Sequence, residues 1–526
     1  MIKLERTKNA SRNIFFGIIL KLYQTVAPFI MRTVLIYCLG VEYLGLNGLF
    51  TSILQVLNLA ELGVGSAMVY SMYKPIAEDD STIICALLNL YKAYYRIIGS
   101  VIAIAGIILL PFIPKLVTGS VPSGINLRYL FLLHLGTTVL TYWLLAYKSS
   151  ILNAHQRTDV LSKITIISNT IQYALQFILL FVSRNYYVYL LVALTVQAGT
   201  NIVSAVITDR LYPNYKAKGK LEKEQKKVIN QRIKDLFTAK LGGTLVNSAD
   251  TIVISAFLGL TTLAIYQNYY YIMTSIIGIV SVIFNSCTAG IGNSLVTESM
   301  DKNYTDFRKL TFVICWISTI CVSCFASVYQ PFMEAWVGKD YMFGMSVVVL
   351  FCVYFYLYVM NSVPVVYKEA GGIWHEDRFR PLVGAIVNLT INLMFVRTYG
   401  IYAILLSTII SYLIVAMPWL IHNIFSVLFK RKSTQYVKEL LYYSFVSIVV
   451  TAITYFICSF IPFNRLIKAA CNGVICVICS NVLLLIIYRN HELLEPTFEL
   501  VDNVTKHKFS KLLFTVIKFI KGGNRK

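Results

Sequence analysis

The sequence predicts an all-α polytopic membrane protein with about fourteen transmembrane helices. Two bulk properties support this prediction: 57% of the 526 residues are hydrophobic, and only 14% are charged. A soluble protein would carry roughly 25% charged residues. The mean hydropathy is +0.67, and apolar runs follow one another along nearly the whole chain. Because no long polar segment separates these runs, the length indicates many membrane spans rather than several soluble domains.

The individual spans are predicted from hydropathy and from the residues that break apolar runs. The predicted spans cover approximately residues 13–38, 44–70, 83–113, 129–150, 160–182, 186–207, 241–258, 262–292, 310–330, 345–366, 379–397, 400–425, 440–461 and 466–488. The basic N-terminus followed by an apolar run resembles a signal peptide. However, Lys21 interrupts that run and no small-residue cleavage site follows it, so we expect an uncleaved first span.

The basic residues predict the orientation of the chain. The longest internal connector, Asp209–Lys240, contains KAKGKLEKEQKK, whereas the opposite connector Lys115–Arg128 is short and holds few cations. The positive-inside rule makes the basic side cytoplasmic, so we expect both termini in the cytoplasm. This distribution also explains the net charge of +22 without a nucleic-acid partner, since no zinc-finger spacing or RNA-binding signature accompanies it.

Cysteine usage indicates neither a metal site nor a disulfide framework. The eleven cysteines lie mostly inside apolar runs. The pairs Cys321/Cys324 and Cys476/Cys479 fit a CxxC pattern, but both pairs lie within predicted spans. A zinc or redox pair needs a polar, accessible loop, so we interpret these cysteines as small packing residues. The sequence also shows no cofactor-binding motif.

The tail after Tyr488 ends in HKFSKLLFTVIKFIKGG. Lys511 and Lys518 would share one face of a helix, with apolar residues elsewhere. This pattern is typical of an amphipathic helix on the inner leaflet, and the alternative is a disordered basic tail.

Short matches suggest an internal repeat with a shift of 219 residues. The segment LGVEYLGL from Leu39 aligns with LGLTTLAI from Leu258, and NTIQ from Asn169 aligns with NLTI from Asn388. Six spans in each copy would place both copies in the membrane in the same direction. Transporters built from such repeats bind their substrate between the lobes near the membrane midplane.

The repeat predicts two pseudo-symmetric six-helix lobes plus two extra C-terminal helices. We divide the chain into an N-lobe at 1–208, a basic cytoplasmic connector at 209–240, a C-lobe at 241–428, two further spans at 429–490, and a cytoplasmic amphipathic tail at 491–526.

The first predicted span contains a polar stripe. Lys21 and Arg32 are eleven residues apart, which at about 100° per residue is close to three turns, so they point the same way and lie ~16 Å apart. Gln24 and Pro28 fall on the same stripe. A charge at membrane depth is tolerated where it faces water or a partner, which predicts a cavity-lining helix. Alternatively, Lys21 and Arg32 extend to the two membrane interfaces.

Two acidic residues lie inside predicted spans. Glu61 shares a helix face with Asn58 and Gly65, and Asp250 follows Asn247 by about one turn. Acids inside apolar helices are functional candidates, and these two are candidates for ion coupling. The structural alternative is an ion pair that locks two helices together.

Further cations lie near the predicted cytoplasmic ends of spans. Lys92 and Arg96 share a face at the start of the third span, and Lys148 ends the fourth. They either contact substrate or anchor the spans by the positive-inside rule. A cationic cavity without a metal-ligand cluster suits an anionic substrate such as a phosphate. The chain has no Walker A glycine loop, so we expect coupling to an ion gradient, the membrane potential or a substrate gradient rather than to ATP.

Several motifs resemble those of one transporter family. They are ELGVGSAMVYSMYKPIAEDD, LLNLYKAYYRIIG, YWLLAYKSSILNAHQRTD and WVGKDY. These segments resemble bacterial polysaccharide flippases of the Wzx type, which handle O-antigen or capsule units within the multidrug/oligosaccharidyl-lipid/polysaccharide exporter superfamily. The resemblance extends over essentially the whole chain, including the number of spans.

The resemblance implies a function. Such proteins move undecaprenyl-diphosphate-linked oligosaccharides across the bacterial inner membrane by alternating access, with H⁺ or Na⁺ as coupling ion and a polysaccharide polymerase or other assembly proteins as partners. By position, the diphosphate or acidic sugars would contact a set of basic and amide side chains, and two acids would serve ion coupling: Lys21, Gln24, Arg32, Arg96 and Lys148 for the substrate, and Glu61 and Asp250 for the ion.

One feature departs from a symmetric arrangement. At the shift of 219 residues, Met31 and Arg32 align with Asp250 and Thr251, so the polar stripe of the first span is not repeated in the seventh. The two lobes are therefore predicted to be electrostatically unequal.

Three other classes of protein compete with a flippase. A multidrug or cation antiporter of the same superfamily is the main alternative, but it would have twelve spans and an acid-dominated cavity. An enzyme such as a polysaccharide polymerase or ligase needs a sizeable outer loop, which this chain lacks. A structural scaffold would not need charges on aligned faces within its spans.

Overall fold

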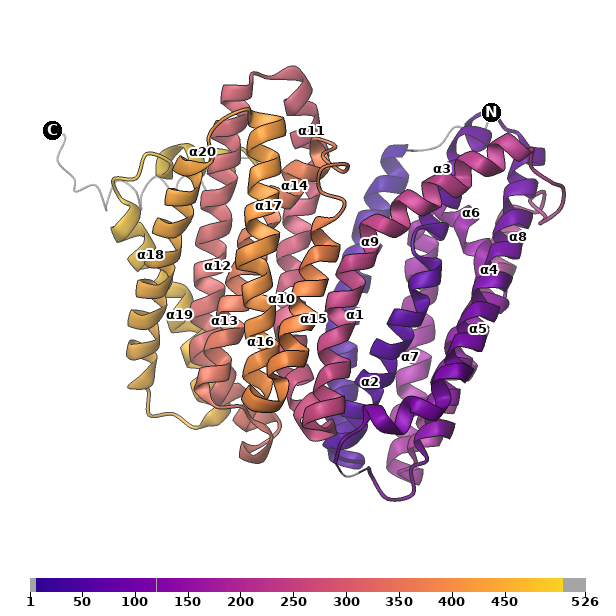
Figure 1. Ribbon diagram of the computed structural model, residues 1–526, viewed down its shortest axis with the longest axis horizontal. Helices are drawn as coiled ribbons and strands as arrows, with labels where there is room; N and C mark the ends of the chain where they lie inside the picture. Colours follow the sequence, from indigo (N-terminus) through magenta and orange to yellow (C-terminus); the bar gives the residue numbers. More distant parts are fainter. Residues whose placement is uncertain (1–5, 120, 505–526) are drawn as a thin grey trace. The chain divides into compact units, whose positions relative to one another are not determined.

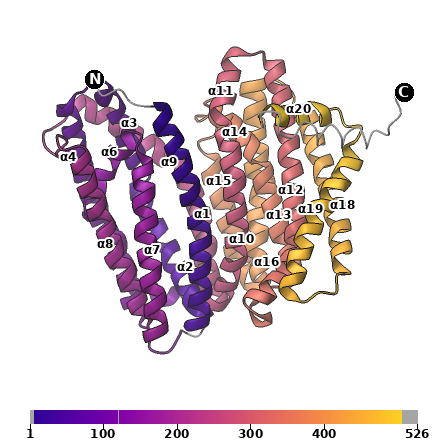
Figure 2. The ribbon, with the colours of Figure 1, turned by 180° about the vertical axis from the view of Figure 1, so that it is seen from behind.

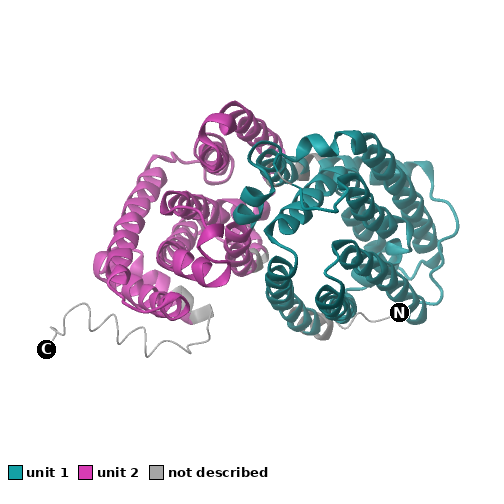
Figure 3. Ribbon diagram, turned by 90° about the horizontal axis from the view of Figure 1, so that it is seen from below, with its two compact units in different colours: residues 1–267 teal, residues 268–526 magenta. Residues whose placement is uncertain are grey.

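The computed structural model describes residues 6–119 and 121–504, and every regular element within them is a helix. The chain divides into two compact units, Met1–Gln267 and Asn268–Lys526 (Figure 3). The division falls inside one helix, α10 (Leu260–Ser286). Because each unit has its own packed interior, the two are described separately below.

Unit 1 contains nine α-helices and three short 3₁₀ segments before α10, within its described residues (Figure 1). They are α1 (Arg6–Cys38), α2 (Val41–Leu57), η1 (Asn58–Glu61), α3 (Val64–Ala77), α4 (Ser81–Leu109), η2 (Leu110–Leu116), α5 (Leu127–Trp143), η3 (Ala146–Lys148), α6 (Ser149–Ala154), α7 (Thr158–Ser183), α8 (Tyr186–Leu211) and α9 (Lys223–Leu258). Among the main pairs, α1 packs on α7, α7 on α8, and α2 on α9.

Unit 2 is built around the long helix α12, which packs against α13, α18 and α19 (Figure 2). Its elements after α10 are α11 (Thr288–Thr297), α12 (Met300–Trp336), η4 (Lys339–Tyr341), α13 (Met345–Met360), α14 (Ser362–Ala370), α15 (Arg380–Tyr399), α16 (Ile401–Ser411), η5 (Tyr412–Ala416), α17 (Met417–Asn423), η6 (Ile424–Phe429), α18 (Thr434–Ser459), α19 (Arg465–Tyr488) and α20 (Leu494–Val504). The segments η5 and η6 are π-helical.

The structure confirms the predicted number of spans. Within the described residues, thirteen helical segments are long and apolar enough to cross a membrane. A fourteenth forms if α5 and the segment Ala146–Ala154, bent by 48° relative to it, count as one span. An all-α polytopic membrane protein is therefore the correct fold class.

One helix extends beyond its predicted span. The sequence predicts a span at 241–258, whereas α9 begins at Lys223, so the second half of the predicted connector 209–240 is helical. The contacts of α9 with α2, α3 and η2 join it to unit 1. The lobe boundaries at 208, 241, 428 and 490 stay a prediction. The predicted tail helix with Lys511 and Lys518 lies outside the described residues.

Side-chain caps explain where several helices begin. Asp80 accepts hydrogen bonds from the backbone N–H groups of Thr82 and Ile83, both at 3.0 Å, and so starts α4. Asn126 and Asn185 start α5 and α8 in the same way. Each cap satisfies N–H groups that have no partner inside the helix, which typically stabilises the folded state by about 1 kcal/mol.

Unit 2 has a buried polar cluster between α15 and α16. The Asn388 amide donates to the Thr408 hydroxyl at 2.9 Å and to the Ser407 hydroxyl at 3.2 Å. Ser407 in turn donates to Asn392 at 2.5 Å, and all four side chains are buried. The membrane interior offers polar groups no water, so these side chains bond to one another instead. The bonds hold α15 against α16.

Glycines allow α2 to lie close to the start of α10 within unit 1. A Cβ added at Gly45 would overlap the backbone carbonyl of Leu260, and one at Gly48 would overlap the side chain of Gln267. Small residues at such positions let membrane helices approach closely and gain van der Waals contact. The packing of α2 against this part of α10 therefore depends on the missing side chains.

We predict that Gly45→Ala lowers the thermal stability of the purified protein, because backbone atoms of Leu260 cannot move as easily as a flexible side chain. Overpacking of this kind costs about 1–3 kcal/mol. Gly199→Ala in α8 is the matched control, since nothing lies within 4 Å of its added Cβ. The control should keep or slightly raise the melting temperature, as alanine favours helix over glycine. Equal melting temperatures for the two variants would contradict the close approach.

Candidate functional site

The first span, α1, exposes two different faces. Leu22, Val26 and Ile30 are exposed and form an apolar face. Lys21 and Gln24 are also exposed, but Val26 and Ile30 lie at least about 120° round the helix from them. The apolar face suits contact with acyl chains, whereas a lysine and an amide do not.

A third face of α1 packs on α7. The Tyr23 hydroxyl lies 2.9 Å from the Thr170 hydroxyl, and the Tyr23 ring lies 6.3 Å from that of Tyr173. Tyr23 lies about 160° round the helix from Lys21, so the polar stripe points away from α7. This packing fixes the rotation of α1 and thereby the direction of its polar face.

Arg32 lies at the other end of the same stripe and is half-buried. Its Nη1 donates to the backbone carbonyl of Gln267 at 3.3 Å. The Gln267 side chain is buried and lies over Gly48, so the close approach of α2 and α10 also positions the carbonyl that Arg32 uses. The structure therefore keeps Lys21, Gln24 and Arg32 on one face, as predicted from their spacing.

The start of α1 is hydrogen-bonded to the motif NAHQRTD, residues 153–159. The Asn13 amide donates to the carbonyl of Gln156 at 2.8 Å and accepts from the backbone N–H of Asp159 at 2.9 Å. The Asp159 carboxylate is 1% exposed and lies 3.0 Å from Arg157 Nε and 3.7 Å from Arg12 Nε. This buried, paired acid ties the first helix to the turn before α7.

His155 of the same motif is a buried packing residue. Its ring lies 4.2 Å from that of Tyr212 and 5.6 Å from that of Tyr215, and Nδ1 lies 3.0 Å from the Ile151 carbonyl. Burial lowers the pKa of the His155 imidazole below its ordinary value, and the bond to Ile151 raises it in part. The net effect favours the neutral ring, which suits contact with two aromatic residues.

Two of the predicted substrate cations, Lys148 and Arg96, lie on η3 and α4 rather than on the first span. Lys148 forms an ion pair with Asp209 of α8, and its side chain is 19% exposed. Arg96 is exposed on α4, and its backbone carbonyl accepts from Trp143 Nε1 at 3.4 Å. Within the part of the chain that the structure describes, no hydrogen bond or ion pair joins either side chain to α1. The ion pair of Lys148 suits the anchoring interpretation of that residue.

Glu61 lies at a break in the second span. The span Val41–Ala77 changes from α2 to the 3₁₀ segment η1, and α3 begins after Gly63, which has a φ of +90°. Left-handed backbone of this kind favours glycine. Transporters commonly form substrate and ion sites at such discontinuous helices, because the break frees backbone groups for binding.

Three tyrosines surround this break, and sequence reasoning missed them. The Tyr95 hydroxyl donates to Glu61 at 3.4 Å, and the Tyr91 hydroxyl donates to Tyr95 at 2.7 Å. The Tyr142 hydroxyl donates to Asn58 at 3.3 Å. The signal available in the sequence was the one-turn spacing of Tyr91 and Tyr95 in LLNLYKAYYRIIG, together with the segment ELGVG, which contains an acid and two glycines.

Asp250 lies within α9 and is 6% exposed. Its helix packs on α2, and the nearby Ser248 hydroxyl donates to Gln55 of α2 at 3.3 Å. The side chain of Asn247 lies outside the described residues. A carboxylate buried in an apolar span is costly in its ionised form unless a partner or a bound cation stabilises it. Asp250 and Glu61 thus occupy different environments within unit 1.

One protein family and several solved structures match this chain. The polysaccharide biosynthesis protein family matches residues 10–288 of the chain. A comparison with curated proteins found no match. Among solved structures, the chain resembles the lipid II flippase MurJ in an inward closed conformation, with 15% identity and a TM-score of 0.63, covering 91% of this chain and 99% of the other.

Two MATE transporters are also similar in fold. An inward-facing MATE family transporter of the MOP superfamily matches with 13% identity and a TM-score of 0.55, covering 77% of this chain and 97% of the other. A MATE transporter from Vibrio cholerae matches with 13% identity and a TM-score of 0.51, covering 81% and 99%. The fold is thus that of MOP-superfamily transporters. Since the family match covers more than half of the chain, this protein belongs to the polysaccharide biosynthesis protein family.

Proposed function

We propose that this protein is a flippase for lipid-linked oligosaccharides in a bacterial inner membrane. It would move undecaprenyl-diphosphate-linked units from the cytoplasmic to the outer leaflet by alternating access, and so supply a polysaccharide polymerase or other assembly proteins. The observation that carries this proposal is the polar face of α1, with the exposed Lys21 and Gln24 and the half-buried Arg32, in a chain of the polysaccharide biosynthesis family.

The chemistry of that face suits a diphosphate. A guanidinium binds phosphate oxygens through two parallel N–H groups, and an ammonium acts as a point charge. Lys21 and Arg32 are separated by ~16 Å along the helix axis, enough for a diphosphate and its first sugars to contact both. Gln24 adds an amide between them that both donates and accepts hydrogen bonds.

Ion coupling is the second part of the proposal. Glu61 at the break of the second span and the buried Asp250 are the two candidates for binding H⁺ or Na⁺. Desolvation favours the protonated form of a carboxyl group, whereas a nearby cation favours the ionised form. A carboxyl group whose surroundings change between two conformations can therefore bias the equilibrium between them.

The alternative is a multidrug or cation antiporter of the same superfamily. The fold likeness to MATE transporters supports it. A cationic substrate would however be repelled by Lys21 and Arg32 on the polar face of α1. The family match and this charge together favour an anionic, lipid-linked substrate.

We predict that the exposed connector residue Lys220 is cytoplasmic and that the exposed Ser123 faces outward, because basic connectors are retained inside. In a cysteine-free variant, a membrane-impermeant maleimide added to intact cells should label Ser123→Cys but not Lys220→Cys. Permeabilised cells, in which both should be labelled, provide the control. The reverse pattern in intact cells would invert the topology.

We predict that Arg32→Ala lowers transport of a lipid-diphosphate oligosaccharide in reconstituted vesicles by roughly 10- to 100-fold, because hydrogen bonds to charged groups contribute about 1.5–3 kcal/mol. Arg32→Lys should restore only part of the rate, since the paired N–H geometry is lost. Arg128→Ala, at an exposed arginine of α5, is the matched control and should transport normally. Normal transport by Arg32→Ala would refute the role of the polar face.

We predict that Asp250→Asn or Glu61→Gln, whichever residue binds the ion, abolishes the response of transport to an imposed proton or sodium gradient. Substrate binding and the melting temperature should remain near normal, since the substituted amide keeps the size of the side chain. The structural alternative predicts lower stability with an unchanged gradient response. If both folded variants still follow the gradient, these two carboxylates do not couple the ion.

A further inference from the structure

The first four turns of α9, before its predicted span, form an amphipathic helix that is held firmly on unit 1. Ile229 is buried and Ile233 half-buried on the apolar side. The packing is close at Gly63, where an added Cβ would lie 2.6 Å from Leu236 Cβ and 3.1 Å from the Ile233 carbonyl. The break after η1 is thus the surface on which this part of α9 rests.

Polar contacts fix the same stretch in place. The Arg232 guanidinium lies 4.2 Å from the centre of the Tyr70 ring and donates to the Ser71 hydroxyl at 3.3 Å. On the other side, the Tyr94 hydroxyl donates to Asn230 at 2.5 Å. Because α3 and α4 both hold it, the helix presents its remaining face at a defined angle.

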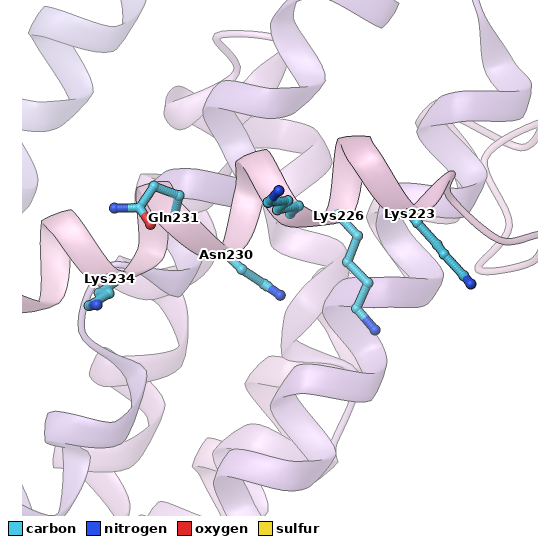
Figure 4. Close-up of a pocket in the computed structure, with 6 residues that line it drawn as sticks. Lys223, Lys226, Asn230, Gln231 and Lys234 are labelled. Atoms are coloured by element: carbon cyan, nitrogen blue, oxygen red, sulfur yellow. The ribbon is translucent and has the colours of Figure 1, made fainter.

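That remaining face is cationic. It consists of Lys223, Lys226, Lys227, Asn230, Gln231 and Lys234, which we call the lysine face (Figure 4). At about 100° per residue these positions span roughly 140° of the helix. Figure 4 shows Lys223 and Asn230 projecting to the same side of α9. Within the described residues, no ion pair neutralises Lys223, Lys226 or Lys227, and Asp235 accepts from Gln231 at 2.9 Å.

An apolar pocket adjoins the lysine face. Lys226 and Asn230 line both, and the pocket continues over Val64, Ile97 and Ile98. Ile97 is 60% exposed and begins a stripe along α4. The further residues of this stripe, at helical spacing and all exposed, are Val101, Ile104 and Ile108. A cationic surface therefore meets a continuous apolar track at one point of unit 1.

We propose that this junction binds the phosphate headgroup of an anionic membrane lipid, with an acyl chain along the Ile97 stripe. The ammonium groups of the lysine face would bind the phosphate oxygens, and the Gln231 amide adds a donor. A basic surface next to a membrane attracts anionic lipids, and the apolar track supplies the contact that a free phosphate cannot use. This site shares no residue with the polar face of α1 and does not depend on the proposed flippase activity.

The test measures lipid binding to the full-length protein in detergent by native mass spectrometry. The probes are dioleoyl phosphatidylglycerol, dioleoyl phosphatidylcholine with the same chains, and inorganic pyrophosphate. We expect wild-type protein to bind phosphatidylglycerol at least tenfold more tightly than either other probe. Lys223→Gln/Lys226→Gln/Lys227→Gln should lose most of this preference and keep its melting temperature, since these lysines are exposed.

The matched control changes three exposed lysines of the preceding connector, as Lys216→Gln/Lys218→Gln/Lys220→Gln. It alters the net charge equally and should retain phosphatidylglycerol binding within twofold. An equal loss in the control would overturn the site, because net charge alone would explain the attraction. Ile97→Ser should weaken phosphatidylglycerol binding without affecting pyrophosphate. Pyrophosphate binding as tight as lipid binding, with Ile97→Ser unchanged, would show a phosphate site without a lipid contribution and would refute the proposal.

Discussion

A charge or polar group at membrane depth needs water or a partner, because hydrocarbon supplies neither. Several polar side chains of unit 1 meet this constraint through contacts with other side chains. Asp159 has two arginines, Lys148 has Asp209, and Glu61 accepts from Tyr95. Lys21 and Gln24 differ, because their side chains are exposed on a face separate from the apolar one. This difference is why the polar face of α1 carries the functional proposal.

The spans were predictable because membrane thickness restricts their length and composition. The predicted first span at 13–38 corresponds to Phe15–Cys38, and the predicted last span at 466–488 to Arg465–Tyr488. The alignment of Lys21 with Arg32 followed from helix geometry alone. The extension of α9 to Lys223 could not be predicted from hydropathy, because its apolar side packs on protein and its other face is too polar to read as a span.

The site was predicted less completely than the fold. Sequence spacing shows which residues share a helix face, but not what a neighbouring helix places opposite them. The tyrosines around Glu61 come from α4 and α5, and the partner of Lys148 comes from α8. Such contacts depend on packing between segments far apart in the chain. Two of the quoted motifs position helices: NAHQRTD holds the start of α1, and Gly63 of ELGVG lies against α9. Glu61 of ELGVG is in addition an ion-coupling candidate.

The continuous course of α9 has a mechanical consequence. The helix has 36 residues and is about 54 Å long. It rests on Gly63 near Leu236, and its far end is tied to the loop after η2, where Thr118 donates to the Ala256 carbonyl at 2.5 Å. Treated as a rigid lever with this fulcrum, the helix has arms of about 20 Å and 33 Å. Both parts of the helix are held, by Tyr94 at Asn230 and by Thr118 at Ala256, so a rocking motion of about 5° moves the Lys223 end by roughly 2 Å and the Leu258 end by roughly 3 Å only if α4 and the loop after η2 move with it.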